Sequence, residues 1–232
     1  MYHLIFPVVG TAIYLNMPSN IRIHPTLIFM ISLLHNTALT AFSFYTFHNL
    51  FLHVYNRGLV FQHQYYFQDP AFDQYIFLFY LSKYYEYIDT LLLYLQGKKP
   101  IFLQKFHHIG AVVCWHLAYY YKVDSIGFIT IANSFIHTIM YSYYLVSLFR
   151  IHWIRKYKIY VTSLQLIQLS SAIILPVIYY PPNETVFNYR VLMIFNTYIL
   201  CLILLFLQFS YRNYFQETYG FPGRPFPFLK RG

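Results

Sequence analysis

The chain has 232 residues, of which 58% are hydrophobic and 23% aromatic, while only 10% are charged and the net charge is +9. Such a composition excludes an ordinary soluble domain and favours a polytopic membrane protein. The two cysteines, Cys114 and Cys201, both lie in apolar runs, which excludes a disulfide framework and a paired-cysteine metal site.

Apolar stretches of roughly 20 residues predict transmembrane helices. The opening MYHLIFPVVGTAIYL lacks a basic start and a small-residue cleavage site, so we expect a short first span rather than a signal peptide. Turn residues fill the connections MPSN, FQDP, GKKP, KVDS and YPPNET, and 1–232 is expected to form a single transmembrane domain. The predicted fold is all-α with seven spans, at about residues 2–15, 27–52, 71–96, 101–121, 126–149, 159–180 and 190–211.

The lysines and arginines divide unevenly between the two sides of these spans. Twelve of the 16 fall on one side, three fall on the other (Arg57, Lys122 and Arg190), and Lys83 lies within a span. The positive-inside rule predicts that the twelve are cytosolic, with the N-terminus outside and the C-terminus in the cytosol. The glycosylation sequon that begins at Asn183 then falls on the outer side.

Charged and polar residues interrupt four consecutive spans. The third span, SKYYEYIDT, holds Lys83, Glu86 and Asp89, and each charge near a bilayer centre costs about 2.5–3.5 kcal/mol. The fourth begins with QKFHH, which places Gln104, His107 and His108 on one helix face at i, i+3 and i+4. The fifth and sixth, NSFIHTIMYSYY and TSLQLIQ, add polar stripes made of these residues: Asn133, His137, Tyr141, Tyr143, Tyr144, Thr162, Gln165 and Gln168.

Taken singly, these residues fit a packing ion pair, an aromatic belt, a structural histidine or interhelical hydrogen bonds. Measured at 1.5 Å per residue, however, all four polar faces fall in the cytosolic half of their spans. The sequence therefore predicts one polar chamber that opens inward. Its basic rim, suited to phosphates or anionic head groups, would comprise Lys98, Lys99, Lys105, Arg150, Arg155, Lys156 and Lys158.

Neutral imidazoles in such a chamber can accept an acyl group from a thioester and pass it on. The motifs SKYYEYIDT, QKFHH, NSFIHTIMYSYY and TSLQLIQ, in this order, resemble the signature of ELO-type very-long-chain fatty acid elongases over residues 24–212. The resemblance implies a multi-pass protein of the endoplasmic reticulum membrane, with helices two to seven surrounding an acyl tunnel. It implies fatty acid elongation by an acyltransferase that condenses acyl-CoA with malonyl-CoA to 3-oxoacyl-CoA, CO2 and CoA.

The same resemblance implies no cofactor, no metal and no nucleic acid. Its implied partners are the two CoA thioesters, membrane lipid, the reductases and dehydratase of the elongation cycle, and a second copy in a homodimer. Carried over, His107 accepts the acyl group, His108 is its box partner, His137 acts as base or enolate stabiliser, and Glu86 and Asp89 orient imidazoles. Lys83 balances their charge. The thioester path and the CoA phosphates would be contacted by Gln104, Asn133, Tyr141, Tyr143, Tyr144, Thr162, Gln165, Gln168, Lys98, Lys99, Lys105, Arg155, Lys156 and Lys158.

Two other classes compete with this interpretation. A membrane di-iron desaturase or hydroxylase also uses HxxHH or QxxHH boxes, but His48 and His53 fall at the outward end of the second span, away from His107. A seven-helix retinal protein would need a lysine in the last span, and residues 190–211 contain none. A small-solute carrier would need a polar path through the outer half of the membrane, where spans six and seven are too apolar, as in SSAIILPVIYY. The commonest elongase box is HxxHH, so Gln104 is a departure that can form hydrogen bonds but cannot titrate.

Overall fold

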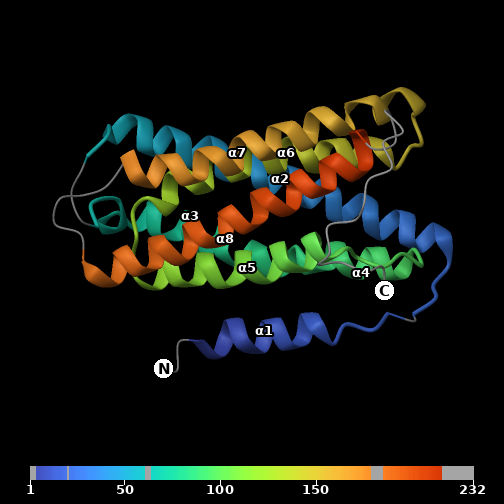
Figure 1. The fold of residues 1–232 in the computed structure, drawn as a ribbon, viewed down its shortest axis with the longest axis horizontal. Coiled ribbons are helices and arrows are strands. Elements are labelled where there is room, and N and C mark those ends of the chain that lie inside the picture. The colour runs from blue at the N-terminus through green and yellow to red at the C-terminus, as the bar shows by residue number, and fades with distance from the viewer. Residues whose placement is uncertain (1–3, 20, 61–63, 179–184, 216–232) are drawn as a thin grey trace.

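The computed structural model describes residues 4–19, 21–60, 64–178 and 185–215, and these are helical apart from short connections (Figure 1). A 3₁₀ turn spans Tyr66–Gln68, another spans His152–Tyr157, and a π-helical turn follows at Tyr211–Phe215. The α-helices are α1 (Ile5–Leu15), α2 (Pro25–Arg57), α3 (Pro70–Tyr85), α4 (Tyr87–Leu95), α5 (Phe102–Tyr120), α6 (Ile126–Ser147), α7 (Lys158–Ile178) and α8 (Val186–Ser210).

Helices α3 and α4 form one span with an interruption at Glu86. The backbone of Glu86 keeps helical angles, with φ −61° and ψ −16°, and its N–H still bonds to the Ser82 carbonyl. Counting α3 and α4 as one, the described α-helices form seven units, which confirms the predicted all-α fold. Two of the helices, α2 and α3, begin with a proline in the first turn and a side-chain N-cap. The His24 side chain accepts a hydrogen bond from Thr26 N–H at the start of α2, and the Asp69 side chain accepts one from Ala71 N–H at the start of α3.

Six of these helical units close into a ring through their mutual contacts. The helices contact one another in the order α2, α6, α7, α8, α5 and α3–α4, and α3–α4 in turn contacts α2. The first helix, α1, stands outside this ring and packs against α5. By length and hydropathy, α2 and the segment Val186–Tyr214 are able to cross a membrane, whereas the 11 residues of α1 rise about 16 Å against a hydrocarbon core of ~30 Å.

One end of the ring, here called the closed end, is packed and tied together. Phe72, Phe79, Trp115 and Phe195 fill its interior and are almost completely buried. At its edge Arg57 Nη2 on α2 lies 2.6 Å from Oδ2 of Asp69, the N-cap of α3. The Ala71 N–H bonded to this carboxylate, together with the Arg57 charge, lowers the pKa of Asp69 below its ordinary value.

Candidate functional site

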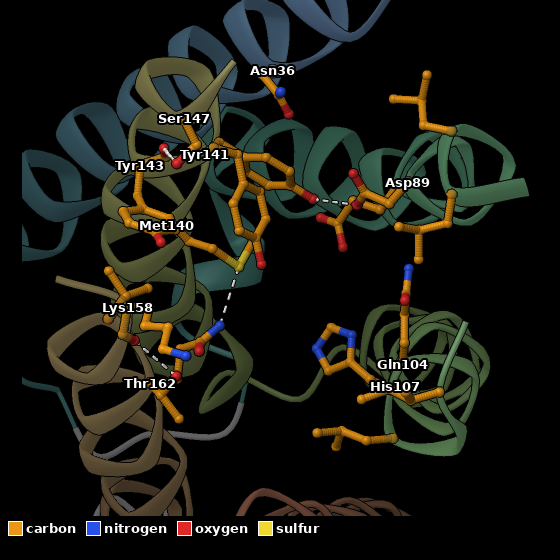
Figure 2. Close-up of a pocket in the computed structure, with 18 of the residues that line it drawn as sticks. Asn36, Asp89, Gln104, His107, Met140, Tyr141, Tyr143, Ser147, Lys158 and Thr162 are labelled. Carbon is orange, nitrogen blue, oxygen red and sulfur yellow. Dashed lines mark hydrogen bonds between the residues drawn. The ribbon is translucent and has the colours of Figure 1, made fainter. Parts of the chain in front are cut away.

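A cavity of about 650 Å³ occupies the other half of the ring, between α2, α4, α5, α6, α7 and the end of α8 (Figure 2). Its volume is in the range of small-molecule binding sites. The cavity brings together most of the residues that the sequence singled out. Those lining it are Glu86, Asp89, Lys98, Gln104, His107, His108, His137, Tyr141, Tyr143, Tyr144, Lys158, Thr162 and Gln165.

Two imidazoles, from helices that are not adjacent in the ring order, line this cavity together. His107 projects from α5 into the open space, as Figure 2 shows, and its ring centroid lies 6.5 Å from that of His137 on α6. His108, the next residue on α5, is buried with its centroid 5.5 Å from that of His107. Tyr198 on α8 donates a hydrogen bond of 2.9 Å to the His107 carbonyl. Its ring lies so close to Gly110 that a Cβ there would overlap it, so Gly110 allows α5 and α8 to meet beside the histidine.

Glu86, at the break between α3 and α4, connects His137 to a buried cation. Its Oε1 accepts from Lys83 Nζ at 2.8 Å, and His137 Nδ1 lies 3.4 Å from the same oxygen. Lys83 and Glu86 are 1% and 2% exposed, so the pair is shielded from solvent. Lys83 Nζ also donates to Asn133 Oδ1 at 3.0 Å and lies 4.0 Å from the centroid of the Phe79 ring.

Three of the predicted site residues therefore stand behind the cavity wall rather than on it. Lys83, Asn133 and Gln168 continue the polar chain inward, with Asn133 Nδ2 3.4 Å from Gln168 Oε1. All three are buried. Their geometry suits the support and charge balance of Glu86 better than contact with a bound molecule.

Asp89, on α4, is held by two other helices. Tyr141 Oη on α6 donates to its Oδ2 at 2.8 Å, drawn as a dashed line in Figure 2, and His35 Nε2 on α2 lies 2.9 Å from its Oδ1. The sequence reasoning missed the contribution of α2, from which Ser32 and Asn36 also line the cavity. A signal was present, because SLLHN places Ser32, His35 and Asn36 at the same i, i+3 and i+4 spacing as the QKFHH box.

The predicted basic rim is only partly at the cavity. Lys98 and Lys158 line it, and the positive φ of Gly97 turns the chain after α4 so that Lys98 N–H bonds back to Leu93. Lys99, Lys105 and Lys156 are not among its lining residues. The side chain of Arg155 and the sequon at Asn183 lie outside the described residues.

The histidines of α2 named in the di-iron alternative do not reach the cavity. His48 is exposed, and His53 Nε2 lies 3.7 Å from Asp69 Oδ2 at the closed end. Among the described residues, no cluster of three or more His, Cys, Asp or Glu side chains could ligate a metal ion. The cavity offers imidazoles, carboxylates, phenols and two lysines, which suit acid–base and nucleophilic chemistry.

Comparison with known proteins identifies close sequence similarity to one family. The ELO (GNS1/SUR4) family model matches residues 1–219. Fatty acid elongase sre1 of Dictyostelium discoideum is 43% identical over 95 residues, covering 40% of this chain and 34% of that protein. Very long chain fatty acid elongase 4 of Trypanosoma cruzi is 37% identical over 103 residues, 44% of this chain and 36% of the relative. The Homo sapiens protein of that name is 30% identical over 159 residues, which cover 62% of this chain and 49% of that protein. The matches thus span about a third to a half of these relatives.

Proposed function

Because the chain belongs to the ELO (GNS1/SUR4) family of polytopic membrane proteins, we propose that it condenses a fatty acyl-CoA with malonyl-CoA. The products are 3-oxoacyl-CoA, CO2 and free CoA. The observation that carries this proposal is the pair of imidazoles, His107 and His137, whose ring centroids lie 6.5 Å apart and which line one cavity. A nucleophile and a second acid–base group within one substrate's reach are what a two-step acyl transfer requires.

In the first step a neutral nitrogen of His107 attacks the thioester carbonyl of acyl-CoA. The new C–N bond forms, the C–S bond breaks, and the proton lost from the imidazole leaves with the CoA thiol. The acyl group is now held on His107, and its carbonyl lies beside the His137 ring. Such an acyl-imidazole remains reactive because imidazole is a good leaving group.

In the second step malonyl-CoA loses CO2, and the electron pair left on its α-carbon attacks the acyl carbonyl. The C–C bond forms, the C–N bond to His107 breaks, and the imidazole regains a proton. His137, oriented by Glu86, stabilises the enolate oxygen or supplies the proton. Lys83 donates a hydrogen bond to Glu86 and holds its carboxyl group beside His137, which fixes the orientation of His137.

The remaining groups arrange the substrates. Asp89 holds Tyr141 against the cavity, and Lys98 and Lys158 at its edge contact the CoA phosphates. Substrate entry from the cytosol agrees with the excess of basic residues predicted for that side, with the N-terminus in the lumen of the endoplasmic reticulum. A homodimer, and contact with the reductases and dehydratase of the elongation cycle, belong to the same proposal.

A microsomal assay with radiolabelled malonyl-CoA and a panel of acyl-CoAs tests the proposal. Wild type is expected to place label in chains two carbons longer, and His107→Ala is expected to reduce this label to the background of untransformed microsomes. The matched control is His48→Ala, because His48 is an exposed histidine of α2. Well-expressed wild type that extends no acyl-CoA would refute the activity, and full activity of His107→Ala would refute the acyl-imidazole step.

A further inference from the structure

Although α1 stands outside the ring, one of its side chains reaches the active-site helices. Tyr14 is only 3% exposed, in contrast to its exposed neighbours Ile13 and Leu15. Its ring centroid lies 4.3 Å from that of Tyr87 on α4 and 5.8 Å from that of His108 on α5. The first helix thus packs a single buried phenol against the box histidine, whereas most of its large apolar side chains are exposed.

The hydroxyl of Tyr14 continues into a short hydrogen-bond chain. Tyr14 Oη lies 2.9 Å from Thr90 Oγ1, and Gln104 Nε2 donates to the same Thr90 oxygen at 3.2 Å. Since the amide of Gln104 is the donor to Thr90, the Thr90 hydroxyl can give its own proton to Tyr14. Three helices, α1, α4 and α5, are joined at this point, and Thr90 is 1% exposed.

The last residue of this hydrogen-bond chain, Gln104, lines the cavity. It stands one turn before His107 and, as Figure 2 shows, extends from α5 toward the helix that carries Asp89. A glutamine has several freely rotating bonds and fixing it costs entropy, so an unanchored Gln104 would move between rotamers. Thr90, held in turn by Tyr14, engages the amide nitrogen and leaves the amide oxygen as an acceptor at the cavity.

We propose that Tyr14 is a positioning residue for the QKFHH box: through Thr90 it fixes the amide of Gln104, and through its ring it supports His108. The active site is therefore incomplete without the first helix, although that helix takes no part in the ring. This inference rests on the proposed function, because its consequence is measured as elongation.

Paired substitutions test the chain. Tyr14→Phe removes the hydroxyl and keeps the ring, and Thr90→Val keeps the shape of the side chain without its hydroxyl. Each is expected to lower kcat by about tenfold, the effect of one buried hydrogen bond, with the KM for both CoA substrates unchanged. The double variant is expected to be no worse than Thr90→Val alone, because Thr90→Val already removes the hydrogen bond that Tyr14→Phe removes. Thr90→Ser, which retains the hydroxyl, is expected to restore wild-type kcat.

Tyr55→Phe is the matched control, since Tyr55 is 74% exposed on α2. Tyr14→Phe with wild-type kcat, or with a loss that multiplies with that of Thr90→Val, would overturn the positioning role. A parallel loss of thermal stability in detergent, with KM and kcat changing together, would also overturn it and indicate packing alone. If wild type itself fails to elongate, the failure lies with the proposed function. If wild type elongates and Tyr14→Phe elongates equally well, the proposed function is supported and only the positioning role of Tyr14 is refuted.

Discussion

Nε2 of His35 on α2 lies 2.9 Å from Oδ1 of Asp89 on α4, and His35 is 2% exposed. The second oxygen of Asp89 accepts the hydroxyl of Tyr141 from α6. One carboxylate at the cavity wall is therefore bound from both sides, and its orientation depends on three helices that are far apart in the sequence. This relationship makes α2 part of the site rather than part of the scaffold.

We expect His35→Ala to lower kcat of elongation by about tenfold or more, because a hydrogen bond to a charged group contributes about 1.5–3 kcal/mol and ~1.4 kcal/mol corresponds to one factor of ten. The measurement is the microsomal elongation rate, normalised to the amount of protein. His48→Ala, an exposed substitution on the same helix, should leave this rate unchanged. Equal rates for both variants would show that Asp89 needs no support from α2.

Lys83→Met should destabilise the protein by about 3–5 kcal/mol, since it leaves the buried carboxylate of Glu86 without its cation. The double variant Lys83→Met/Glu86→Gln removes both charges and should recover most of the stability. It should not recover activity, because a neutral amide no longer orients His137 electrostatically. Thermal unfolding in detergent and elongation rates, measured on both variants, separate the two effects. Recovery of activity along with stability would contradict the role given to Glu86.

Gly110→Ala places a methyl group that overlaps the ring atoms of Tyr198, so α5 and α8 must separate or the Tyr198 side chain must rotate. We expect a loss of about 1–3 kcal/mol in stability from overpacking. We also expect reduced elongation, because Tyr198 holds the His107 carbonyl. Tyr198→Ala combined with Gly110→Ala should be less harmful than the sum of the single changes. Strict additivity of the two would contradict a direct contact between these residues.

The closed end gives a prediction about pH. The pKa of Asp69 is lowered in the folded protein, so its carboxylate adds stability above the ordinary carboxyl pKa of about 3.9. That contribution disappears as the pH falls through the lowered folded value. Asp69→Asn should therefore be less stable than wild type at pH 7, with a difference that shrinks below about pH 4. Thermal unfolding of both proteins in one detergent, from about pH 3 to about pH 7, measures this difference in stability. A difference independent of pH would assign the effect to capping alone.

Much of the fold follows from hydropathy. The predicted spans at 27–52 and 101–121 correspond to Pro25–Arg57 and Phe102–Tyr120, because apolar length and turn residues define both ends. The break at Glu86 was not predicted. SKYYEYIDT contains neither proline nor glycine, so nothing local marks it, and the interruption coincides with a buried carboxylate bound by Lys83 and lying near His137.

The cavity was predicted from polar residues at helical spacing, but two residues that support its lining side chains from behind were missed. His35 was missed because polar residues are scattered along the whole of α2, although its spacing from Ser32 matches that of His107 from Gln104. Tyr14 could not be recognised from sequence, because one tyrosine among 27 in the chain carries no signal until its neighbours are known. Depth along a span is readable from sequence, whereas the facing partner on another helix depends on the ring.

The spacing of Lys83 and Glu86 has a consequence for how the protein is made. Three residues apart on consecutive turns, they can pair within their own segment before any later helix has been synthesised. The pair can therefore enter the lipid as a neutral unit, which lessens the insertion cost of about 2.5–3.5 kcal/mol for each of its two charges. Asp89 has no cation at that spacing and obtains Tyr141 only when α6 arrives. His35, on a helix synthesised earlier, is the partner already present in the bilayer during that interval.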